Sequence, residues 1–82
     1  MKEGVLFSMN KHKLNLITMT DVNDFVKITK SCDGWIHVMD KDRNYICNGK
    51  SLLGLLYSME WAEVYCESEN DIYNQIERFI AE

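Results

Sequence analysis

The stretch WIHVMDKDRNYICNGKSLLGLL, residues 35–56, decides the fold because it holds two strand patterns and a helix pattern in direct succession. Apolar and aromatic residues alternate in 35–40 and 44–49, and polar residues lie between them, which predicts a β-hairpin. A helix is predicted over residues 51–59. Ser51 precedes its apolar run, and serine is among the best N-cap residues.

Each predicted strand has one apolar face. In residues 35–40, Ile36 and Val38 fall on the same side because strand side chains alternate. The opposite side carries Trp35, His37 and Met39. In the second strand, Tyr45 and Cys47 share a side. The hairpin is therefore expected to turn one face toward the core.

A further strand and helix are predicted before this unit. Leu14 and Leu16 alternate with polar residues in HKLNLITM, residues 12–19, as in a strand. Apolar residues recur at helical spacing in TDVNDFVKITKS, residues 20–31, with Thr20 as a suitable N-cap. Acidic residues open this segment and lysines close it, which suits the helix dipole.

The same patterns continue after the hairpin and its helix. WAEVYCE, residues 61–67, alternates as a strand, and ENDIYNQIERFIAE, residues 69–82, predicts an amphipathic helix. Its apolar stripe consists of Ile72, Ile76, Phe79 and Ile80. The element order β-α-β-β-α-β-α predicts an α/β (α+β) sandwich of two layers, with helices on one face of an antiparallel sheet. We expect residues 1–12 to form an N-terminal extension and residues 13–82 the domain.

Composition excludes several classes of protein. Eighty-two residues allow one small domain, and 46% hydrophobic content without proline indicates a compact fold. The formal net charge of −4 argues against nucleic acid as a partner. No stretch approaches the roughly 18 apolar residues that a membrane span requires, so we expect no membrane insertion.

Three widely spaced cysteines, Cys32, Cys47 and Cys66, do not form a disulfide framework, which would need an even number. Reduced thiols in a cytoplasm are the simpler account. A zinc site built from the cysteines and His37 lacks a Cys-x-x-Cys pair. We therefore expect no metal and no cofactor.

Three short motifs resemble the HPr family, the phosphocarriers of the bacterial sugar phosphotransferase system. They are FVK at residues 25–27, GKSLLGLL at residues 49–56 and the acidic ESENDIYNQIERFI at residues 67–80. The resemblance covers about residues 13–81 and implies an open-faced β-sandwich, in which a four-stranded antiparallel sheet carries three helices on one face.

The chain departs from this family where the phosphate would be carried. The family's segment is Gly-Leu-His-x-Arg-Pro-Ala, just before the first helix. Aligned from FVK, Thr18 stands at the histidine, Thr20 at the arginine and Asp21 at the proline. A threonine hydroxyl does not replace an imidazole that titrates near neutral pH. We therefore expect no catalytic residue here and no histidine phosphotransfer.

Another histidine is the alternative. His12 lies before the alternating leucines of the predicted first strand, and His37 lies within the second on its non-core side. Neither opens a helix, whereas a phosphate site of this kind depends on a helix N-terminus. An active phosphocarrier that uses His12 remains the alternative to a protein without histidine phosphotransfer.

Ser51 has a second reading beside that of a cap, because a helix N-terminus favours a phosphate on its cap residue. The resemblance implies regulatory phosphorylation at Ser51. It also implies that Leu52, Leu53 and Leu56 form an exposed patch for partners, with Lys50 beside them and Leu55 in the core.

The resulting expectation is a cytoplasmic, non-catalytic HPr-like protein. Its partner would be a protein of the phosphotransferase system or of transcriptional regulation, and its control would operate at Ser51. The other hypothesis, of a different class, is a small interaction domain with no connection to sugar transport.

Overall fold

The computed structural model describes residues 10–81 of the chain. Four strands form one antiparallel sheet in the order β1-β4-β2-β3. Their bounds are Lys11–Leu14 for β1, Ile36–Asp40 for β2, Ile46–Asn48 for β3 and Val64–Ser68 for β4. The helices are α2 (Met19–Lys30), α3 (Leu52–Ser58) and α4 (Tyr73–Ile76), which continues as a 3-10 turn, η1 (Glu77–Phe79).

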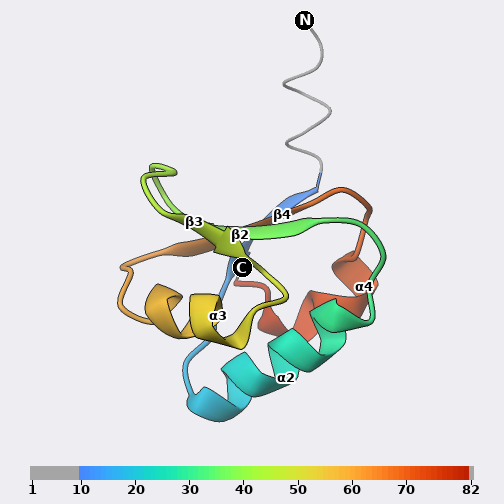
Figure 1. Ribbon diagram of the computed structural model, residues 1–82, viewed down its shortest axis with the longest axis horizontal. Coiled ribbons are helices and arrows are strands. Elements are labelled where there is room, and N and C mark those ends of the chain that lie inside the picture. Colours follow the sequence, from blue (N-terminus) through green and yellow to red (C-terminus); the bar gives the residue numbers. More distant parts are fainter. Residues whose placement is uncertain (1–9, 82) are drawn as a thin grey trace, which may run out of the picture.

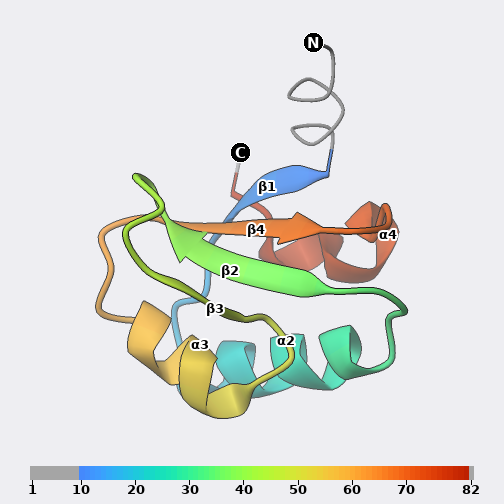
Figure 2. The same cartoon turned by 45° about the horizontal axis from the view of Figure 1, so that its top comes forward.

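Helices α2, α3 and α4 cover one face of the sheet, and within the described residues no helix covers the other (Figure 1). Figure 2 shows the same two layers from a second angle. This is the predicted open-faced α+β sandwich, with the predicted element order. The fold prediction is confirmed.

The core lies between the sheet and the helices, as the alternation predicted. Ile36 and Val38 of β2 and Cys66 of β4 are buried against it. Phe25 of α2 packs edge-on against Phe79 of η1, with ring centroids 5.5 Å apart. The other buried members are Leu14, Val22, Val26, Leu55, Ile72 and Ile76.

The first strand differs from the predicted stretch 12–19 at both ends, since β1 begins at Lys11 and already ends at Leu14. Lys11 pairs with Glu67 and His12 pairs with Cys66, both in β4, so Lys11 and His12 belong to the sheet. The placement of His12 in the N-terminal extension was therefore wrong. Residues 1–9 of the predicted N-terminal extension lie outside the described residues.

The last predicted helix, residues 69–82, is much shorter than expected. Helix α4 ends at Ile76, η1 follows, and the chain then becomes extended. Ile80 forms a bridge with Leu14, and the N–H of Ala81 donates to the Lys13 carbonyl over 2.8 Å. Pairing with β1 satisfies these backbone groups without a helix. The helical spacing of the apolar residues therefore extends further along the sequence than the helix does.

Met39 also differs from its neighbours on the open face of the sheet. Alternation places Met39 on the open face together with His37. Met39 is nevertheless fully buried, whereas His37 is exposed. The guanidinium of Arg43 lies 3.3 Å from the Met39 sulfur. A long side chain from the β2–β3 loop thus covers an apolar residue where no helix does.

Candidate interaction surface

The amino end of α2 is closed by its own side chains. Thr18 is the N-cap, and its hydroxyl oxygen accepts a hydrogen bond from the Asp21 N–H over 3.1 Å. The Asp21 carboxylate in turn accepts from the N–H groups of Ile17 and Thr18, over 3.0 and 3.1 Å. These backbone hydrogen bonds, first that from Thr18 and then that from Ile17, lower the pKa of Asp21. The amino end of α2 therefore already holds an anionic group, the Asp21 carboxylate.

Thr20 is not the N-cap, so that prediction was wrong. Thr20 is an exposed residue of the first turn, and the helix begins at Met19, two residues earlier than a cap at Thr20 would predict. Asp21 determines the choice, because at the third helical position its carboxylate reaches back to the Thr18 N–H. The signal was present as the capping-box pattern Thr-x-x-Asp.

The two histidines lie elsewhere. His12 belongs to β1, and its ring centroid lies 5.5 Å from that of Tyr73 in α4. His37 lies on the open face of the sheet, opposite α2, and stacks on Trp35 with centroids 4.7 Å apart. Each ring thus has an aromatic neighbour, on an element other than α2.

Helix α3 is capped by Ser51, as predicted. The Ser51 hydroxyl oxygen accepts from the Gly54 N–H over 3.2 Å. Gly54 faces β3, where an added Cβ would lie 3.0 Å from the Cβ of Cys47. Leu55 is fully buried in the core. The glycine thus permits the close approach of helix and strand.

The predicted partner-binding leucines differ in exposure. Leu53 is 64% exposed and points away from the core, and Leu52 is also exposed. Leu56 is half-buried and packs against the core cluster. Because Leu52, Leu56 and Met59 recur at i, i+4 and i+7, they follow one line along α3.

More apolar side chains lie at the start of α2. Ile17 is 68% exposed and Met19 is half-exposed. A hollow of about 360 Å³ is lined by Leu16 and Met59 among others, which brings the segment before α2 next to the end of α3. We call Ile17, Met19, Leu52, Leu53, Leu56 and Met59 the α2–α3 face. Sequence reasoning had missed Ile17, Met19 and Met59, because they belong to segments that become neighbours only in the fold.

Three lysines lie on α2 or just before α3. Lys27 and Lys30 are exposed in the last part of α2, and no carboxylate of residues 10–81 forms an ion pair with either. Lys50 instead donates from its Nζ to the Cys32 carbonyl over 2.7 Å, at the carboxyl end of α2. A cation there also complements the helix dipole. Lys50 thus has a structural role that its place beside Ser51 did not reveal.

Cys32, Cys47 and Cys66 are free thiols, and burial raises the pKa of Cys66 to about 12. Among residues 10–81, no three His, Cys, Asp or Glu side chains are grouped to hold a metal ion. In the same part of the chain, every helix is too short or too polar to cross a membrane.

Comparison of the chain with protein-family models, with curated proteins and with solved structures finds no match. The resemblance to the HPr family therefore stays a prediction from the three short motifs.

Proposed function

We propose that this chain is a protein-binding domain that docks a partner through the α2–α3 face and does not carry phosphate on histidine. The observation that supports it most is the exposure of Leu52 and Leu53 on α3, and of Ile17 and Met19 at the start of α2 next to the end of α3. Clustered apolar side chains on a surface are typical of interaction sites. Burying a leucine side chain contributes about 1.5–3 kcal/mol, so a few such contacts sustain a complex.

The charge around the face indicates the kind of partner. Lys27 and Lys30 are exposed in the last turn of α2, one of the two helices that carry the face, although the chain as a whole is acidic. A partner with an apolar centre and an acidic rim complements this arrangement, and the rim charges would mainly raise the association rate. In keeping with the family resemblance, we propose a protein of the phosphotransferase system or of transcriptional regulation.

The test begins with a photo-crosslinking residue at Leu53 in the native host, with the same residue at Ile46 as control. Ile46 is 51% exposed but lies on β3, away from the α2–α3 face. The captured protein is then purified, and its affinity is measured by calorimetry for wild type, Leu53→Ala and Ile46→Ala. We expect Leu53→Ala to weaken binding about tenfold and Ile46→Ala to leave it unchanged. Equal effects of the two substitutions would place the partner elsewhere.

We further propose that phosphorylation of Ser51 regulates this docking. A phosphate there would stand beside Leu52 and Leu53, so it would alter both the charge and the contact surface of the face. The chain is incubated with the serine kinase of the HPr family, and phosphate incorporation is followed by mass spectrometry. Ser51→Ala should abolish incorporation and Ser31→Ala should not. An unmodified wild type would remove this regulatory step and leave the docking proposal standing.

The alternative function, phosphate transfer by His12, has a direct test. Incubation with Enzyme I and labelled phosphoenolpyruvate should leave the chain unlabelled. Acid-labile, alkali-stable label that disappears in His12→Ala would instead establish an active carrier. A crosslinked partner outside sugar transport and its regulation would support the small interaction domain with no connection to that system.

A further inference from the structure

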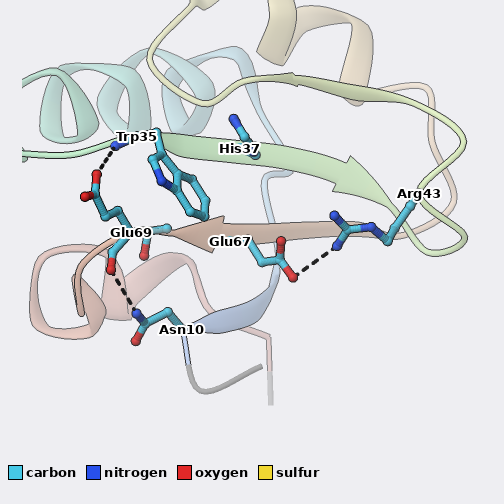
Figure 3. Close-up of a pocket in the computed structure, with 7 residues that line it drawn as sticks. Asn10, Trp35, His37, Arg43, Glu67 and Glu69 are labelled. Carbon is cyan, nitrogen blue, oxygen red and sulfur yellow. Dashed lines mark hydrogen bonds and ion pairs between the residues drawn. The ribbon is translucent and has the colours of Figure 1, made fainter. Parts of the chain in front are cut away.

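The open face of the sheet is hollowed between β2 and β4, on the side away from the α2–α3 face (Figure 3). The hollow has a volume of about 770 Å³. Ligand sites typically have volumes of about 300–1,000 Å³, so it has room for a ligand. Its lining residues are Asn10, Trp35, His37, Arg43, Glu67, Ser68 and Glu69.

One wall of the hollow is aromatic. Trp35 and His37 stack with ring centroids 4.7 Å apart and planes inclined by 25°. Trp35 is 45% exposed, so part of its ring is open to a ligand. The indole face attracts cations more strongly than any other aromatic side chain, and it also stacks with flat groups.

The charged groups favour a cation. Glu67 is mostly covered and pairs with Arg43, whose Nη1 lies 3.0 Å from the Glu67 carboxylate. The carboxylate of Glu69 accepts a hydrogen bond from the backbone N–H of Trp35 over 3.3 Å, and no cation of residues 10–81 forms an ion pair with it. Among the residues that line the hollow, one guanidinium thus stands against two carboxylates, and the carboxylate without an ion pair, Glu69, is the one beside the indole.

We propose that this hollow binds an arginine side chain of a partner peptide, with its guanidinium stacked on Trp35 and paired with Glu69. A guanidinium is flat, weakly hydrated and able to donate two parallel hydrogen bonds to a carboxylate, so it meets both requirements at once. An ammonium group meets only the charge requirement. The size of the hollow leaves room for the peptide main chain on either side of the arginine. This site is separate from the α2–α3 face and does not depend on the proposed function.

Arg43 shows how the same surface already holds one guanidinium. It lies against the Met39 sulfur, at 3.3 Å, and pairs with the Glu67 carboxylate. The proposed arginine would repeat this combination at the other end of the hollow, with Trp35 in place of Met39 and Glu69 in place of Glu67. Figure 3 shows Trp35 and Glu69 at one end and Arg43 at the other.

The first test is an NMR titration of the full ¹⁵N-labelled chain with the blocked tripeptide Gly-Arg-Gly. The matched control is the same peptide with citrulline, which has the shape of arginine without its charge. We expect shifts centred on the Trp35 indole N–H and on the amides of His37 and Glu69, with the citrulline peptide binding about tenfold more weakly and a lysine peptide in between. Equal binding of the arginine and citrulline peptides, or shifts centred elsewhere, would overturn the proposal.

The second test uses variants. Glu69→Gln keeps an oxygen that accepts from the Trp35 N–H and removes only the charge, so we expect about fivefold weaker binding of the arginine peptide. Trp35→Leu should weaken it similarly, and Tyr45→Leu, which changes an exposed aromatic ring outside the hollow, should not. Unchanged affinity in Glu69→Gln decides against the site even if Trp35→Leu fails to fold. Tighter binding of free arginine than of the blocked peptide would contradict a peptide as the occupant.

Discussion

Helices α2 and α3 both begin at a hydroxyl N-cap, yet the third helical position differs between them. In α2 it is Asp21, whose carboxylate reaches back to the backbone N–H of Thr18. In α3 it is Gly54, which has no side chain. The hydroxyl of the cap Ser51 accepts a hydrogen bond from the Gly54 N–H, and no side chain of the described residues reaches back to the Ser51 N–H. One helix start therefore contains a fixed negative charge and the other contains none.

The difference follows from packing on β3. A Cβ at Gly54 would lie 3.0 Å from the Cβ of Cys47 and 3.3 Å from its sulfur, so any side chain there meets the strand. Asp21 is only partly buried, so its carboxylate is able to fold back over the helix end. Similar cap residues are thus followed by a carboxylate in α2 and by no charge in α3, because the neighbouring element decides which residue is tolerated at the third helical position.

The largest effect should come from placing the α2 carboxylate at the corresponding position of α3. We expect Gly54→Asp to lower the free energy of unfolding by about 2 kcal/mol or more, because the side chain overpacks against Cys47. Leu53→Asp is the matched control, since it adds the same charge to the same turn at an exposed position, and it should change stability by less than about 0.5 kcal/mol. Urea denaturation measures both. A stabilised Gly54→Asp would show that packing does not exclude the capping box.

Removing the cap hydroxyl of α2 should have the next largest effect. Thr18→Ala loses the acceptor for the Asp21 N–H, and we expect a loss of about 1–2 kcal/mol in the free energy of unfolding. Thr18→Ser keeps the hydroxyl and serves as the control, with most of the stability retained. Equal losses in both variants would assign the effect to the methyl group instead of the cap.

The corresponding change in α3 should be smaller. We expect Ser51→Ala to cost about 0.5–1 kcal/mol, because one hydrogen bond of 3.2 Å is lost from a helix of seven residues. The measurement is again urea denaturation, at the same temperature as for Thr18→Ala. A larger loss for Ser51→Ala than for Thr18→Ala would reverse the comparison of the two helix starts.

The smallest effect concerns pH. Because hydrogen bonds from the Thr18 and Ile17 N–H groups lower the pKa of Asp21, its carboxylate stabilises the fold above the ordinary aspartate pKa of about 3.9. This contribution is lost as the pH falls through the lowered pKa of the folded state. The stability difference between wild type and Asp21→Asn should therefore be constant near neutral pH and shrink in acid. A difference that stays constant down to pH 2 would contradict the assignment.

The two-layer fold was predictable from the sequence because alternation and helical spacing report burial directly. Ile36, Val38 and Cys66 are buried as alternation predicted, and Leu55 of α3 is buried as the family resemblance implied. The ends of elements were less predictable, as the last segment shows. Ile80 keeps the helical spacing of Ile76, but it bridges to Leu14 of β1, and sequence periodicity does not reveal such a long-range pairing.

The candidate surfaces were predictable only where they follow a single element. The exposure of Leu53 could be inferred because a short helix does not bury its whole circumference. Ile17 and Met59 are far apart in the sequence, and the packing of α2 against α3 brings their segments together. The hollow on the open face combines the β2–β3 loop, β4 and Asn10, so it appears only once strand order is known.

The segment after η1 has a consequence for self-association. The N–H of Asn15 donates to the Phe79 carbonyl over 2.7 Å, and Ala81 pairs with Lys13, so the outer margin of β1 is partly occupied. The opposite margin, β3, has three residues. An invading strand would thus find one border of the sheet obstructed and the other very short, which protects a small protein with exposed apolar side chains against fibril growth.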